Sequence, residues 1–201
     1  MFREWEALRR FEETFFQFLE MELKWSRSSS ALFRQADRFF FTATLDVNKQ
    51  STWKLEAKPM SLDPVYWSIM KMDENNDRPL SFRALGEGLP GLLIAKKEVQ
   101  TAEYSEAQMA RKFVAWFSNE ASLYADRHES HPFSKLVESH EHYRARGAYA
   151  ETLICSLFEE GRMREAIDLS KKFVTGEKES VSAYSSNGLS FLLEVLEWPH
   201  Y

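Results

Sequence analysis

The sequence contains a single cysteine, Cys155, and this scarcity excludes two kinds of structure. No intrachain disulfide can form, and a cysteine-rich zinc site cannot be built. A reduced, cytoplasmic setting is therefore the expected location. Glycine and proline are also scarce, with 7 and 6 residues, so long flexible linkers are not expected.

Long apolar runs are absent as well. No segment approaches the roughly 18 apolar residues that a membrane span needs. The opening segment MFREWEALRR mixes charged and apolar residues, which is unlike a signal peptide. We therefore expect neither an export signal nor a membrane partner.

Basic side chains are not in excess. Residues 1–100 carry 15 basic and 15 acidic side chains, whereas residues 101–201 carry 11 and 16, so the net charge of -5 comes from the second half. A basic footprint for nucleic acid is therefore missing, and nucleic acid is not an expected partner. The acidic half suits a basic protein partner, although ordinary solubility also explains it.

Catalytic motifs are missing too. Residues 86–91, GEGLPG, lack the GxGxxG spacing of a phosphate-binding loop, and neither GxSxG nor HExxH occurs. Cys155 lies in the apolar stretch LICSL, where a cysteine behaves as a small buried hydrophobe instead of a nucleophile. We expect no enzyme and no cofactor.

What the sequence does contain is alternation of apolar and other residues. It runs through Arg38–Val47, RFFFTATLDV, and again through Thr52–Lys58. A period of two is typical of a strand with one buried face, so these segments predict two antiparallel strands. Three shorter segments are predicted as further strands: Ala31–Arg34, Val65–Met72 and Leu80–Leu85. The polar stretch Asp73–Pro79 is predicted as a loop.

Apolar residues at three- and four-residue steps predict helices elsewhere. One covers residues 3–24, and a capping box of Ser105 and Gln108 opens another over residues 105–124. The remaining predicted helices are one that starts at Pro132, a hairpin of Tyr149–Glu160 and Met163–Val174 about Gly161, and a last helix over Asn187–Trp198.

These elements predict an α+β fold. An antiparallel sheet packs against helices 3–24 and 105–124, and an all-helical C-terminal lobe follows. We predict the sheet domain over residues 1–125 and a helical lobe packed on it over residues 126–201.

Four histidines, His128, His131, His140 and His142, lie near carboxylates and suggest a metal site as an alternative. The stretch DRHESH places the first two in a predicted interhelical loop, and the spacing does not force the four to converge. Exposed loop histidines are therefore favoured, and no bound metal is expected. Such a group could also make the region pH-sensitive.

Candidate partner-binding residues are one aromatic and several acidic side chains. Phe40 falls on the strand face opposite Phe39 and Phe41, so either helices cover both faces or Phe40 belongs to an exposed patch suited to binding. The acidic candidates are Asp73, Glu74, Asp77, Glu159, Glu160 and Asp168.

The order of a helix, then FRQADRFFFTATLDVNKQSTW, then helices resembles a broad class of bacterial domains with an N-terminal helix and an antiparallel sheet. The resemblance covers residues 10–120, with Arg38-Phe39 and Gln50–Trp53 at the strand and turn. Domains of this class lie beside secreted toxins in bacterial antagonism loci and look like cognate immunity proteins. The resemblance implies a non-catalytic inhibitor of a toxin.

A second resemblance is local. Residues 148–169, with a Gly161-Arg162 turn followed by Glu165-Ala166-Ile167, look like one tetratricopeptide-type helical hairpin. A single unit does not support a superhelical groove.

We therefore predict an immunity protein that sterically neutralises a toxin acting in the cytosol, such as a nuclease. The alternatives are an adaptor that uses the hairpin and a metal-dependent enzyme built on the His128–His142 region. The toxin's identity, the interface and the oligomeric state, including a homodimer, are left open by the sequence.

Overall fold

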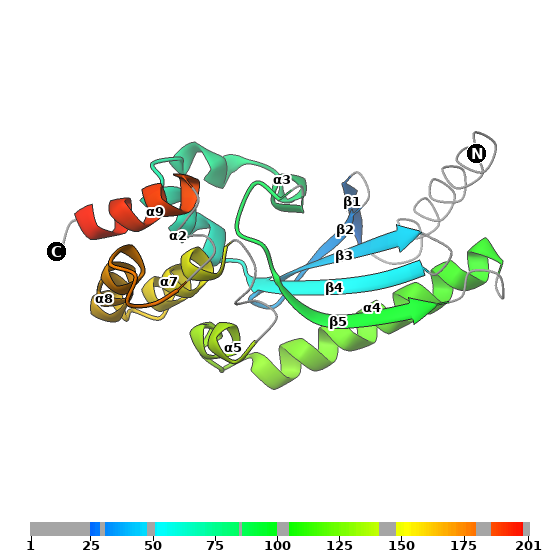
Figure 1. Ribbon diagram of the computed structural model, residues 1–201. Coiled ribbons are helices and arrows are strands. Elements are labelled where there is room, and N and C mark those ends of the chain that lie inside the picture. The colour runs from blue at the N-terminus through cyan, green and yellow to red at the C-terminus, as the bar shows by residue number, and fades with distance from the viewer. Residues whose placement is uncertain are drawn as a thin grey trace, which may run out of the picture. The chain divides into compact units, whose positions relative to one another are not determined.

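The computed structural model describes residues 25–28, 31–47, 51–84, 86–99, 105–140, 148–179 and 186–198. These residues form an antiparallel sheet and a set of helices, so the fold is α+β as predicted (Figure 1). The predicted helix over residues 3–24 lies outside the described residues. The chain divides into two compact units, residues 1–57 with 93–129 and residues 58–92 with 130–201. The boundary predicted from the sequence, at residue 125, places residues 58–92 in the sheet domain. The division into compact units instead groups them with the later helices.

Unit 1 is built on the sheet, whose five strands follow the order of the chain. The register of the second and third strands is set at a tight turn, where Ala36 pairs with Phe39 and Asp37 takes a φ of 51°. The strands are β1 (Ser26–Ser28), β2 (Ala31–Ala36), β3 (Phe39–Val47), β4 (Ser51–Pro59) and β5 (Leu92–Val99), the ends of the last two reaching into unit 2.

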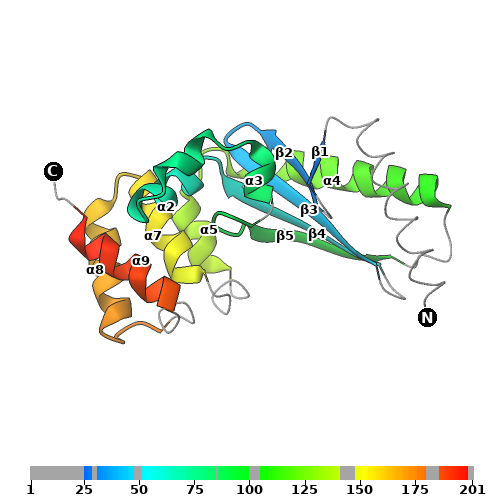
Figure 2. The same cartoon turned by 90° about the horizontal axis from the view of Figure 1, so that it is seen from above.

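The alternating apolar residues of β3 and β4 form a buried face, as predicted, and α4 (Glu106–His128) covers that face. Trp53 of β4 meets the ring of Phe113 edge-on at a centroid distance of 4.9 Å. Phe39 of β3 packs against Tyr124 at 5.2 Å. Both views show α4 running along the sheet (Figures 1 and 2). Large rings at strand and helix spacing thus form the core of unit 1.

Phe40 does not belong to an exposed patch, so that expectation is wrong. Its side chain is 1% exposed, and its ring lies 5.9 Å from that of Phe33 on β2. The side chains on both faces of β3 are therefore buried at this position.

Unit 2 contains helices where the sequence predicts two strands. Val65–Met72 is not a strand, because residues 62–69 form α2 (Leu62–Ile69). Short apolar runs do not distinguish the two periods, and the spacing of Leu62, Tyr66 and Ile69 also fits one side of a helix. Leu80–Leu85 is likewise wrong, since α3 (Leu80–Ala84) starts directly after Pro79, where a helix tolerates proline.

The predicted helical hairpin is present as α7 (Tyr149–Glu159) and α8 (Met163–Val174). Gly161 joins them with a φ of 73°, a conformation that favours glycine. Residues 149–157 are all buried, and α7 lies among the other helices of the unit in both views (Figure 2). The remaining elements of unit 2 are the 3-10 helix η1 (Asp73–Asp77), α5 (Phe133–Ser139) and α9 (Ser186–Glu197).

The capping box of α4 gives the first testable prediction. The Ser105 hydroxyl accepts a hydrogen bond from the Gln108 amide at 3.4 Å, and the Gln108 side chain accepts one from the Ser105 amide at 3.0 Å. Replacing Ser105 with alanine should lower the free energy of unfolding by about 1 kcal/mol, measured by urea denaturation. Ser105→Asp should retain most of the stability, and equal loss in both variants would contradict the capping role.

Candidate functional site

A buried ion cluster joins four segments of unit 2. The Asp63 carboxylate, which is fully buried, accepts hydrogen bonds from Lys58 Nζ at 2.8 Å and from the Leu89 amide at 2.9 Å. Arg83 Nη1 lies 3.4 Å from the same carboxylate and donates to the Met60 carbonyl at 2.7 Å. The cluster therefore connects the end of β4, α2, α3 and the loop before β5.

Every polar group of this cluster is engaged in holding the fold. Lys58 also donates to the Leu89 carbonyl at 2.6 Å, and the Arg83 guanidinium lies 5.0 Å from the centre of the Trp67 ring. A side chain at Gly88 would overlap the Asp63 carboxylate, so the glycine lets the loop close over it. Both oxygens of Asp63 accept hydrogen bonds within the fold, so the cluster holds these segments together.

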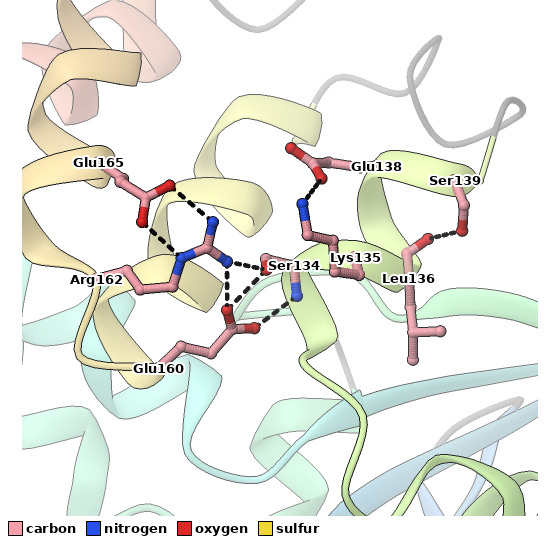
Figure 3. A network of polar contacts seen from close by, with 8 residues as sticks. All are labelled: Ser134, Lys135, Leu136, Glu138, Ser139, Glu160, Arg162 and Glu165. Atoms are coloured by element: carbon pink, nitrogen blue, oxygen red, sulfur yellow. Dashed lines mark hydrogen bonds and ion pairs between the residues drawn. The ribbon is translucent and has the colours of Figure 1, made fainter.

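A second polar network lies at the turn between α7 and α8 (Figure 3). The Glu160 carboxylate accepts from the Ser134 amide at 2.8 Å and from the Ser134 hydroxyl at 2.7 Å. Arg162 donates to Glu160 at 2.9 Å and forms two hydrogen bonds with Glu165. Glu160 thus caps α5 from another element, because Pro132 offers no side-chain cap of its own.

The hydrogen bonds from Arg162 lower the pKa of the Glu165 carboxyl below its ordinary value. A carboxyl with a lowered pKa in the folded state stabilises that state above its unfolded pKa, and the contribution is lost as the pH falls through the folded pKa. Glu165 is exposed, so solvent screens the effect.

The acidic candidates do not form one patch. Glu160 is used within the fold, and Glu159 accepts a hydrogen bond from Ser61 at 3.0 Å. Asp168 is exposed on α8, 3.7 Å from Lys171. Ser61 lies before α2, whereas η1 lies after it. Helix α2, which is about 12 Å long, therefore separates Glu159 from the carboxylates of η1.

The three carboxylates of η1 are different, because they face solvent. Asp73, Glu74 and Asp77 are all exposed, and no side chain in the described part of the chain pairs with them. Next to them, Lys71 forms an ion pair with Glu194 of α9 at 2.7 Å. The pair joins the turn before η1 to α9, and we term the exposed surface of these two elements the η1–α9 face.

Sequence reasoning missed part of the η1–α9 face. Leu189 and Leu193 of α9 are 40% and 45% exposed, whereas Phe191, Leu192 and Val195 are buried. The four-residue step between the two leucines, out of phase with the buried residues, is the signal that could have found them. Lys58, Asp63 and Arg83 carry no comparable sequence signal.

The histidine and cysteine candidates that the structure describes do not gather into one cluster. Among the described residues, no three His, Cys, Asp or Glu side chains gather where they could hold a metal ion, and His142 lies outside them. His128 is the last residue of α4, and His131 is exposed in the loop that follows. Burial, with the nearby charges of Glu151 and Asp63, raises the pKa of the Cys155 thiol, so the thiolate is disfavoured.

Comparison with protein-family models, with curated proteins and with solved structures gave no match for this chain. Within the described ranges, every helix falls short of the length or the apolar character needed to cross a membrane.

The buried cluster generates a prediction about stability. Asp63→Ala leaves two cationic groups buried without their shared anion, and it should lower the free energy of unfolding by about 3–5 kcal/mol. Asp77→Ala, which removes an exposed carboxylate of η1, should change it by less than about 0.5 kcal/mol. Chemical denaturation followed by tryptophan fluorescence measures both, and similar values for the two variants would show that Asp63 does not have this role.

Proposed function

We propose that this chain is a non-catalytic immunity protein that binds a bacterial toxin and neutralises it by steric occlusion. The class rests on the resemblance of residues 10–120 to domains found beside secreted toxins. The toxin is one that acts in the cytosol, with a nuclease as the leading candidate, and the immunity protein works in the same compartment.

The observation that carries the proposal is the exposure of the η1 carboxylates. A charged group that serves the fold is usually paired, as Asp63 and Glu160 are here. Asp73, Glu74 and Asp77 stand exposed without a described partner. Exposed charges of one sign accelerate encounter with a surface of opposite sign. A nuclease needs a basic surface to hold its substrate's phosphates, so it offers that surface.

Steric occlusion is the mechanism that these residues support. Covering a substrate-binding surface requires complementary shape and charge, and it requires no acid, base or nucleophile in the inhibitor. The polar clusters around Asp63 and Glu160 join several segments of unit 2, and an inhibitor that is ordered before binding loses less conformational entropy.

The adaptor alternative depends on the α7–α8 hairpin as a peptide receptor. Residues 149–157 of α7 are all buried among neighbouring helices, which leaves that helix no free surface for a peptide. Helix α7 is therefore better explained as part of the core of unit 2.

The test begins with capture of the tagged full-length chain from its native bacterium, where one near-stoichiometric toxin-like partner is expected. The variant Asp73→Asn/Glu74→Gln/Asp77→Asn should then associate with that partner about tenfold more slowly at low salt, because it loses electrostatic steering. High salt should reduce the difference, since it screens exposed charges. Stopped-flow fluorescence measures the association rate.

A matched control removes three charges from unit 1, as Glu98→Gln/Asp126→Asn/Glu129→Gln. It should associate at nearly the rate of the unmodified chain. Capture of no toxin-like partner would refute the immunity function, whereas equal slowing in both variants would refute the role of η1.

A further inference from the structure

Exposed apolar side chains concentrate on the last two helices of unit 2. Of the four large hydrophobic residues exposed in the described ranges, three lie there: Val174, Leu189 and Leu193, with the fourth, Leu123, on α4. Scattered exposed leucines are normal on protein surfaces, whereas a group of them on two packed helices is a candidate interaction site.

Helix α9 places its two leucines on one side. Leu189 and Leu193 are four residues apart and lie one above the other, and Glu197 continues the same row toward the C-terminal end. The opposite side, with Phe191 and Val195, is fully buried. The solvent side of α9 therefore presents a short apolar stripe that ends in a carboxylate.

Helix α8 packs against α9 and carries the third exposed apolar side chain. The Ser170 hydroxyl donates to the Leu192 carbonyl at 2.8 Å, which fixes α8 against α9. Val174 lies one turn beyond Ser170 and is 37% exposed. Exposed apolar residues thus lie on two helices that a buried hydrogen bond holds together.

The other flank is acidic. Glu194 follows Leu193 around the helix and binds Lys71, whose ammonium group also interacts with Glu197. Lys71 is followed by the exposed carboxylates of η1, beginning at Asp73. A ligand for this surface therefore needs apolar groups over the leucines and positive charges toward η1.

We propose that the η1–α9 face binds an amphipathic helix of a partner protein, with a leucine-type stripe bordered on one side by lysine or arginine. Helices of this kind place apolar residues at three- and four-residue steps, which matches the spacing of Leu189 and Leu193. The proposal deepens the proposed function, on which it rests, by naming the part of the partner that is bound.

A second copy of this chain fits the η1–α9 face less well. An antiparallel two-fold pairing of two α9 helices brings the η1 carboxylates of both copies to the same side of the interface. A parallel pairing places Glu197 opposite its own equivalent. Like charges oppose each other in both arrangements, whereas a basic helix meets neither conflict.

The test uses two fluorescein-labelled synthetic peptides, each designed as a helix of about five turns with the same leucine stripe. One carries lysine along one flank and the other carries glutamate at the same positions. In fluorescence anisotropy with the full-length chain, the lysine peptide should bind at least tenfold more tightly than the glutamate peptide. Leu189→Ser/Leu193→Ser should weaken the binding of the lysine peptide at least tenfold.

Leu123→Ser is the matched control, because Leu123 is equally exposed but lies on α4 of unit 1. It should leave the affinity unchanged. Equal binding of both peptides, or equal loss in the α9 and α4 variants, would overturn the assignment of this face. A captured toxin whose affinity is insensitive to Leu189→Ser/Leu193→Ser would also overturn it while leaving the immunity function intact.

Discussion

The ion cluster of Lys58, Asp63 and Arg83 is the constraint on which unit 2 depends. One buried carboxylate holds two cations and a backbone amide, so the end of β4, two short helices and a loop meet at a single point. Neither α2, with eight residues, nor α3, with five, is long enough to be stable alone. Their positions follow from the need to keep this buried charge paired.

The two polar networks of unit 2 engage several of its charged side chains within the fold. Asp63, Glu160 and Arg162 are each bound by several partners within the fold. The thiol of Cys155 is fully buried, and its raised pKa disfavours the nucleophilic thiolate. Among the described residues of unit 2, the carboxylates of η1 and two leucines of α9 remain exposed, and the binding function proposed above is based on them.

Regular patterns were sufficient to predict much of the fold. The β3 and β4 strands, the Ser105 capping box and the α7–α8 hairpin each have a local cause in periodicity, capping or a glycine turn. The strand prediction for Val65–Met72 was wrong because a run of eight residues fits both the helical and the strand period. The strand β5 was missed because apolar and polar residues do not alternate in Leu92–Val99. The exposure of η1 was predictable from its polarity. The Asp63 cluster and the burial of Phe40 were not, because both depend on contacts with segments distant in sequence.

The central claim is that this chain acts through the η1–α9 face. Hydrogen–deuterium exchange of the full-length chain, alone and with its captured partner, tests it most directly. The account predicts that binding slows amide exchange in Asp73–Asp77 and in the exposed turns of α9, while the strands of unit 1 exchange as before. Protection confined to β2 and β3, with η1 and α9 unchanged, would contradict it.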